Sequence, residues 1–235
     1  MLEINKIHHW DCLELIKLLS DNSIDLIIAD PPYDIKNTQA GGVSNLAKSM
    51  QKMNNELKDT GLNINLWIDW CKEVPRIQEK INCYIRCNKS QIPQYLNYFI
   101  SLWCSFDIIC WRKTNAMPTF NNKYLSDKEY CLYFRKWGYC NPESYQDART
   151  IYEQPINITD KNHFTHPTIK PLNIIETLIR NSSKIWQLIL DPFMWSGTTA
   201  IASINMKRDY IWFELDEKYV KIANKRIKFN PVWLF

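Results

Sequence analysis

Two short apolar segments that each end in an Asp-Pro pair constrain the fold of this chain most strongly. Residues 24–29 run into Asp30-Pro31-Pro32-Tyr33, and residues 187–190 run into Asp191-Pro192. Short apolar segments rich in Ile and Leu, bounded by turn residues, are typical of buried strands. Because proline lacks the N–H that a sheet ladder needs, each strand must end where its prolines begin. The sequence therefore predicts two buried strands with an aspartate at each carboxyl end.

Further apolar segments alternate with segments of helical periodicity. Strands are predicted at residues 81–87, 106–112, 129–134 and 210–213, and helices at residues 13–19, 171–181, 198–205 and 217–229. The helix at 171 begins with a proline, which suits a first turn, and the helix at 217 ends in basic residues, which suit its dipole. Strands that alternate with helices indicate an α/β fold with a mostly parallel sheet.

The composition is typical of a soluble globular protein. The chain has 235 residues, enough for a single domain over 1–235, and its 46% hydrophobic and 23% charged residues argue against disorder. No segment approaches the ~20 apolar residues of a membrane helix, and the N-terminus lacks a secretory pattern, so we expect a cytoplasmic protein with no membrane partner. The eight cysteines form no Cys-x-x-Cys pair, which favours reduced thiols over disulfides or a metal site.

Three acidic residues follow predicted strands. In open α/β sheets, ligands bind beyond the carboxyl ends of the strands, and Asp30, Asp191 and Glu214 would cluster there. After Asp191, the pair Ser196-Gly197 leads into a predicted helix start, whose free N–H groups favour a carboxylate or phosphate. Glu214 follows Asp191 by 23 residues (214 minus 191), a spacing that suits the ribose hydroxyls of a nucleotide-like ligand.

The Asp30-Pro31-Pro32-Tyr33 tetrad indicates a more specific chemistry. The exocyclic amine of adenine is a poor nucleophile, because its lone pair is delocalised into the ring. The Asp30 carboxylate and the Pro31 carbonyl can accept its hydrogens, and successive prolines keep these acceptors aimed. The Tyr33 ring can stack on a base taken out of the duplex. The structural alternative is a strand that ends in a proline turn with a core tyrosine.

These motifs and their order resemble the β group of circularly permuted DNA amino-methyltransferases of the adenine-N6 type. In that group the catalytic tetrad precedes the cofactor loop, and here the two stand 161 residues apart (191 minus 30). The resemblance covers nearly the whole chain. The matching segments are residues 11–14 with 23–27, residues 111–113, residues 129–132, His166-Pro167-Thr168-Ile169-Lys170-Pro171, and residues 191–199, which resemble Asp-Pro-Phe-x-Gly-Ser-Gly-Thr-Thr.

The resemblance implies a Rossmann-like methyltransferase fold, circularly permuted, with a mostly parallel seven-stranded sheet, one antiparallel strand and helices on both faces. It implies S-adenosylmethionine (AdoMet) as cofactor, double-stranded DNA as partner, and either a homodimer or a partner subunit. It makes Asp30, Pro31, Pro32 and Tyr33 catalytic. The residues that it places around the cofactor are Asp11, Cys12, Asp30, His166, Thr168, Lys170, Asp191, Phe193, Trp195, Ser196, Gly197, Thr198 and Glu214.

Within this set, Asp11 would contact the adenine of the cofactor. His166, Thr168 and Lys170 would lie near the methionine carboxylate. The alternative interpretation of Lys170 is a solvent-exposed lysine at the start of a helix.

Two polar segments, residues 35–62 and 138–165, are predicted to be surface insertions. Both are candidates for DNA contact, and for the first a solvated loop is an equal alternative. The second is shorter than the target-recognition regions usual in the family. Loose specificity, recognition shared with residues 35–62, and a partner subunit are the alternatives.

The chain departs from the family pattern at Trp195, which stands where glycine is usual. Glycine allows a left-handed backbone and close approach of a ligand. Either the indole lies outward or over the cofactor and activity survives, or the ring blocks the pocket. Trp10 likewise replaces a glycine before Asp11, and Ile169 replaces a glutamine.

The predicted function is methyl transfer to the N6 amine of adenine in a flipped-out base, in a restriction-modification setting. Aspartate at the first position of the tetrad is typical of adenine enzymes. The alternatives are an N4-cytosine DNA methyltransferase, a catalytically weakened DNA-binding relative, and an enzyme for an RNA or protein substrate. The chain contains no Pro-Cys pair for the C5-cytosine route.

Overall fold

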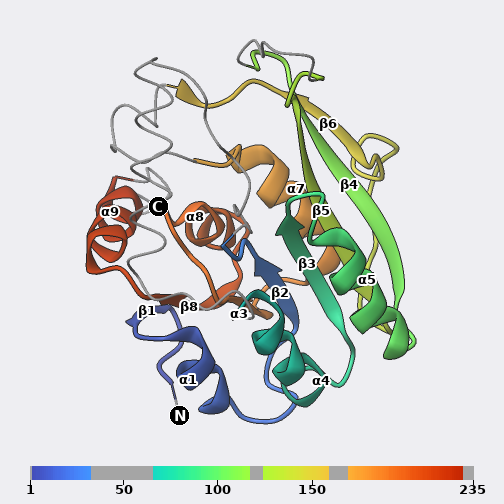
Figure 1. Cartoon of the computed structure of the whole chain (residues 1–235). Helices are drawn as coiled ribbons and strands as arrows, with labels where there is room; N and C mark the ends of the chain where they lie inside the picture. The colour runs from blue at the N-terminus through green and yellow to red at the C-terminus, as the bar shows by residue number, and fades with distance from the viewer. Residues whose placement is uncertain (1, 33–65, 117–123, 159–168, 230–235) are drawn as a thin grey trace.

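The computed structural model describes residues 2–32, 66–116, 124–158 and 169–229, which form a mixed sheet with helices on both faces (Figure 1). The sheet has eight strands in the order β1-β8-β7-β2-β3-β5-β4-β6. In that order the strands are β1 (Lys6–His9), β8 (Asp209–Glu214), β7 (Leu188–Asp191), β2 (Leu26–Ala29), β3 (Asn82–Cys87), β5 (Lys128–Arg135), β4 (Ser105–Lys113) and β6 (Ile151–Gln154).

Two layers of helices cover the sheet, as the strand pattern requires. Along β2, Ile27 and Ala29 pack on one side, whereas Leu26 and Ile28 pack on the other, because successive side chains of a strand point to opposite faces. The first side carries α1 (Cys12–Lys17), η1 (Trp70–Glu73), α4 (Val74–Ile77) and α5 (Ile92–Ser101), and α3 (Leu66–Asp69) precedes η1. The second carries α7 (Leu172–Ser182), α8 (Thr198–Asn205) and α9 (Glu217–Lys228).

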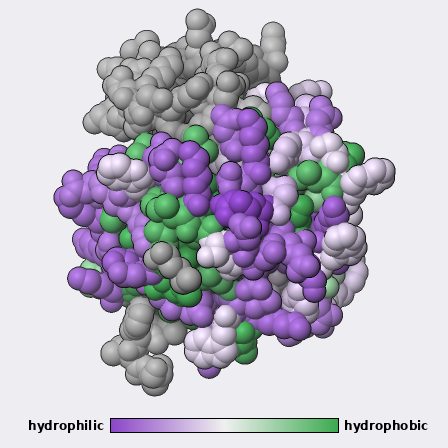
Figure 2. All heavy atoms as spheres, turned by 90° about the horizontal axis from the view of Figure 1, so that it is seen from below, coloured by the Kyte–Doolittle hydropathy of each residue, from purple (hydrophilic) through white to green (hydrophobic). Residues whose placement is uncertain are grey.

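One strand runs against the others. The pairs β1–β8, β8–β7, β7–β2, β2–β3 and β4–β6 are parallel, whereas β5 is antiparallel to both β3 and β4. The carboxyl ends of the parallel strands therefore share one edge of the sheet, and β5 begins at that same edge. Figure 2 shows the opposite edge, where hydrophilic side chains cover most of the face around a smaller apolar group.

The α/β fold, the mostly parallel sheet with an antiparallel strand, and the helices on both faces are confirmed. The predicted count of seven strands is corrected to eight. Two of the eight, β1 and β6, match no predicted strand segment. β6 lies within the predicted insertion 138–165 and pairs with β4 from Cys110↔Ile151 onward. Its four residues alternate between exposed and half-buried, so they carry no apolar run that marks a strand. The first polar insertion, residues 35–62, lies outside the described residues.

None of the described helices combines the length and the apolarity needed to cross a bilayer. The eight cysteines are free thiols, and six of them are buried.

Replacing Gly197 by alanine should destabilise the protein. Gly197 caps the amino end of α8 with φ of 76°, and an added Cβ would lie 2.9 Å from the Cβ of Ala223 on α9. The left-handed backbone and the overpacking together predict a loss of about 2–4 kcal/mol in the free energy of unfolding, measured by urea denaturation. The double variant G197A/A223G removes the clash but keeps the backbone strain, so it should recover part of the loss. A Gly197→Ala protein as stable as wild type would contradict the packing described.

Candidate active site

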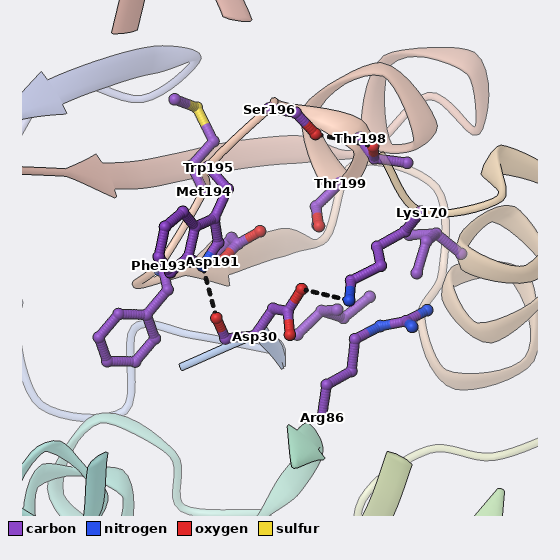
Figure 3. Close-up of a pocket in the computed structure, with 12 residues that line it drawn as sticks. Asp30, Arg86, Lys170, Asp191, Phe193, Met194, Trp195, Ser196, Thr198 and Thr199 are labelled. Carbon is purple, nitrogen blue, oxygen red and sulfur yellow. Dashed lines mark hydrogen bonds and ion pairs between the residues drawn. The ribbon is translucent and has the colours of Figure 1, made fainter. Parts of the chain in front are cut away.

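A pocket opens at the edge of the sheet where the neighbouring strands β2 and β7 end. Asp30 follows β2 and Asp191 ends β7, so the register of these two strands brings the carboxyl groups to the same place. Figure 3 shows the pocket from inside. Its lining comprises Ile28, Asp30, Arg86, Lys170, Ile175, Asp191, Phe193, Met194, Trp195, Ser196, Thr198 and Thr199.

Asp30 is paired with a buried lysine. The Nζ atom of Lys170 lies 3.3 Å from Oδ2 of Asp30 and 2.9 Å from Oε2 of Glu129, so one ammonium bridges two carboxylates. The Lys170 side chain is 10% exposed, which rules out the reading of Lys170 as a lysine in solvent. Because Lys170 comes two residues before α7, the start of this helix delivers the cation to the end of β2.

Glu129 is the centre of a small charge network. It lies near the start of β5, and the antiparallel direction of that strand places it at the edge where the parallel strands end. Besides Lys170, its carboxylate meets Nζ of Lys113 at 2.9 Å and Nη1 of Arg86 at 3.8 Å. Burial raises the pKa of Glu129, but Lys170, Lys113 and Arg86 outweigh it and lower that pKa to about 2. Glu129 thus pairs with three cations, and one of them, Lys170, also pairs with Asp30.

The pKa values of Asp191 and Glu214 are shifted in the opposite direction, upward. Burial raises the pKa of Asp191 to about 7, against hydrogen bonds from Thr199 and from the Phe193 N–H, and the charges of Asp30 and Glu214 add to the rise. Burial also raises the pKa of Glu214 to about 7. The predicted cluster of three carboxylates at one edge is therefore present, and Asp30 and Glu214 lie close enough to Asp191 to raise its pKa.

The loop between β7 and α8 is tied down from three sides. The Met194 N–H donates to the carbonyl of Phe213 at 3.0 Å, and the Trp195 N–H donates to Oε2 of Glu214 at 2.8 Å. From α9, the buried guanidinium of Arg226 donates to the carbonyl of Ser196 and to Oγ1 of Thr198. These contacts place the Ser196 and Thr198 hydroxyls in the pocket wall.

Trp195 adopts the backbone conformation expected for the glycine that it replaces. Its φ is 51°, in the left-handed region. Its indole Nε1 donates to the backbone carbonyl of Asp30 at 2.6 Å (Figure 3). Its ring lies against Tyr219 with a centroid distance of 5.7 Å. The ring therefore turns toward the turn after β2 rather than outward into solvent.

Asp11 and Cys12 lie further along the same edge. Asp11 caps α1 by accepting a hydrogen bond from the Leu13 N–H at 2.7 Å. It follows β1, whose last residue His9 is in register with Glu214. Asp11, Cys12 and Glu214 thus lie at the ends of β1 and β8, beyond the pocket lining, and Gly197 lies in the loop beside it. Tyr33, His166 and Thr168 lie outside the described residues.

Several residues of the site were not predicted as such from the sequence. They are Arg86, Glu129, Lys113, Arg226 and Gln91, whose Nε2 donates to the Pro32 carbonyl at 3.2 Å. Arg86 could have been predicted, because a charged residue inside an otherwise apolar strand, 4% exposed here, needs a buried partner. Glu129 and Lys113 stand in segments that match the family, but the role of Glu129 depends on the direction in which β5 runs. Arg226 reads as one of several basic residues at the end of an amphipathic helix.

The polar side chains of the site suit a ligand that carries both cationic and hydroxyl groups. Buried carboxylates at Asp191 and Glu214 can accept hydrogen bonds from ammonium and ribose groups, and the buried hydroxyls of Ser196 and Thr198 add short polar contacts. Within the described residues, no group of three or more His, Cys, Asp or Glu side chains could hold a metal ion. Fold and site together describe an α/β protein with a polar pocket next to an Asp-Pro-Pro turn.

The chain belongs to the DNA methylase family, whose model matches residues 24–225. Among curated relatives, the type II methyltransferase M2.MboI of Moraxella bovis is 28% identical over 94% of this chain and 86% of its own length. M.HinfI of Haemophilus influenzae, also a type II methyltransferase, is 27% identical over 97% of this chain and 70% of its own length.

Solved structures agree with this assignment. The crystal structure of the M1.HpyAVI–SAM complex has a TM-score of 0.70 and 26% identity, covering 95% of this chain and 99% of that one. The cytosine-N4-specific PvuII DNA methyltransferase has a TM-score of 0.71 at 15% identity, covering 98% and 89%, and shares the fold.

Removing the Glu129 carboxylate should destabilise the protein strongly. Glu129→Gln removes the carboxylate that pairs with Lys170, Lys113 and Arg86, and breaking a buried ion pair costs about 3–5 kcal/mol. The matched control is Glu153→Gln, because Glu153 pairs with Arg112 at 2.6 Å where both side chains are nearly half exposed. That change should cost about 0–1 kcal/mol. Equal losses in urea unfolding would show that the Glu129 network has no special weight.

The stability of the protein should fall as pH rises from about 4 to about 7. A carboxyl whose pKa is raised by folding binds its proton more tightly in the folded state. Its stabilising contribution is therefore complete below the unfolded pKa and is lost as pH passes the folded value of about 7, as for Asp191 and Glu214. Asp191→Asn should make this decline shallower in urea unfolding between pH 4.5 and 7.5. An unchanged decline would mean that Asp191 is not protonated in the folded protein.

Proposed function

We propose that this DNA methyltransferase transfers a methyl group from AdoMet to the exocyclic N6 of adenine in a base flipped out of double-stranded DNA. The observation that carries this proposal is the Asp30 carboxylate at the end of β2, held by Lys170 and adjoining the loop of residues 191–199. Aspartate at the head of the tetrad supports adenine over cytosine as the target.

The cofactor would lie along the edge formed by the ends of β7, β8 and β1. AdoMet, as in the complex of the relative M1.HpyAVI, supplies a methyl group on a positively charged sulfonium. Glu214 would accept hydrogen bonds from the ribose hydroxyls, and Asp11 with Cys12 would flank the adenine. The residues proposed around the methionine part are Asp191, Phe193, Trp195, Ser196, Gly197, Thr198, His166 and Thr168.

Asp30 and the turn that follows it would handle the amine of the target base. The carboxylate and the Pro31 carbonyl would accept its two hydrogens and draw the nitrogen toward a tetrahedral geometry. Its lone pair would then attack the methyl carbon while the carbon–sulfur bond breaks, and the sulfur would keep that electron pair as a neutral thioether. The nitrogen then carries a positive charge and loses one proton toward Asp30. Tyr33 would stack on the flipped base. Lys170 is proposed to lie near the methionine carboxylate. Its ammonium group would also fix the orientation of the Asp30 carboxylate.

The setting proposed is restriction-modification, supported by the type II relatives. Residues 35–62 and 138–165 are proposed to contact the DNA as insertions in one methyltransferase domain. A homodimer or a partner subunit remains a prediction.

The target base can be identified directly. Plasmid DNA from cells that express the chain is digested to nucleosides, and the modified base is identified by mass spectrometry. N6-methyladenine is the expected product. N4-methylcytosine would reassign the base but keep the chemistry, whereas unmodified DNA from cells containing folded protein would refute the proposed function.

Asp30→Ala should abolish methylation but keep AdoMet binding. The loss should exceed about 10³-fold in kcat, because it removes an acceptor that acts in the transition state. Asp107→Ala is the matched control, since Asp107 is an exposed residue of β4. It should retain near wild-type turnover. Retained turnover by Asp30→Ala, or loss of AdoMet binding measured by calorimetry, would remove Asp30 from the catalytic role.

A further inference from the structure

The turn after β2 has few backbone groups that can form hydrogen bonds. Pro31 and Pro32 have no N–H, so hydrogen bonds can fix this part of the backbone only through its carbonyl oxygens. Side chains from two segments that are distant in sequence donate hydrogen bonds to the two outer carbonyls, those of Asp30 and Pro32. Nε1 of Trp195 donates to the Asp30 carbonyl at 2.6 Å, and Nε2 of Gln91 donates to the Pro32 carbonyl at 3.2 Å. Within the described residues, no hydrogen bond reaches the Pro31 carbonyl between them.

We propose that Trp195 and Gln91 are positioning residues that clamp the catalytic turn at its two outer carbonyls and keep the Pro31 carbonyl for the amine of the target base. This inference rests on the proposed function. Neither residue touches the amine itself. Each acts through the backbone that it holds.

Gln91 is itself fixed. It is 1% exposed and lies at the start of α5, where its Oε1 accepts a hydrogen bond from the Asn88 N–H at 3.1 Å. With Oε1 taken by a donor, the amide nitrogen must point the other way, toward Pro32. The helix therefore delivers a donor of defined direction to the turn.

Trp195 is held at both ends. Its backbone N–H donates to Glu214, and its ring lies against the ring of Tyr219 on α9. A left-handed backbone disfavours every residue with a Cβ, and glycine would adopt it freely. Trp103, Trp137 and Trp186 share this backbone conformation with exposed side chains, so the conformation alone assigns no role. The hydrogen bond from the indole to the Asp30 carbonyl is what distinguishes Trp195.

Trp186 provides the matched control. It lies before the other end of β7 in the same left-handed conformation, with φ of 68°, but its side chain is 70% exposed. Replacing it by phenylalanine makes the same chemical change as at Trp195, without a donor to the turn.

The experiment compares Trp195→Phe, Trp195→Gly, Gln91→Met and Trp186→Phe with wild type. Methyl transfer is measured with saturating AdoMet and a DNA duplex, and the AdoMet Kd is measured by calorimetry. The Trp195 and Gln91 variants should lose about 10- to 100-fold in kcat, as expected when reacting groups are misplaced. The AdoMet Kd of Gln91→Met should stay within about threefold of wild type, whereas the Trp195 variants, whose residue is also proposed to face the cofactor, should lose less in AdoMet affinity than in kcat. Trp186→Phe should match wild type in both.

Each other result overturns the inference. Wild-type or higher kcat in Trp195→Gly would show that the ring merely obstructs the pocket. A loss of AdoMet affinity as large as the loss in kcat would assign the ring to the cofactor instead of the turn. Trp195→Gly relieves backbone strain, so it keeps the test decisive if the phenylalanine variant does not fold. If wild type itself methylates no DNA, the proposed function and this role are both wrong.

Discussion

The site depends on the position of β2, a four-residue strand that is buried throughout and hydrogen-bonded to a parallel strand on each side. Pairing on both sides fixes its register, and a shift by one residue would move Asp30 to the other face of the sheet. The two prolines then end the strand at once. A strongly determined core element thus delivers a reactive carboxylate to the surface of a pocket with little freedom of placement.

Ion pairs among buried charged side chains form the side of the pocket next to β3, β4 and β5. A carboxylate at Asp30 needs a cation, and a buried cation such as Lys170 needs more than one partner to offset its desolvation. Glu129 supplies the second partner, and Arg86 with Lys113 completes the set. Four strands and the segment before α7 therefore meet in one ionic network. The antiparallel direction of β5 has a chemical consequence, since a parallel strand would carry Glu129 to the opposite edge.

Much of this arrangement could be predicted from local sequence. Apolar runs that end in Asp-Pro marked β2 and β7, and the acid after the next strand marked Glu214. Local patterns did not mark β6, whose half-exposed residues alternate without an apolar run, or Glu129, whose role comes from strand direction. The conformation of Trp195 followed from the glycine that it replaces. The hydrogen bond of its indole depends on two segments 165 residues apart in sequence, and no local pattern encodes it.

The raised pKa values of Asp191 and Glu214 have a consequence for ligand uptake. Near neutral pH, each of these buried carboxyls holds a proton for part of the time. A ligand that brings an ammonium group to Asp191 would favour its charged form and release its proton into solvent. The pocket would then behave as a proton exchanger, in which a bound cation replaces a bound proton. The heat released on binding would accordingly depend on the ionisation enthalpy of the buffer.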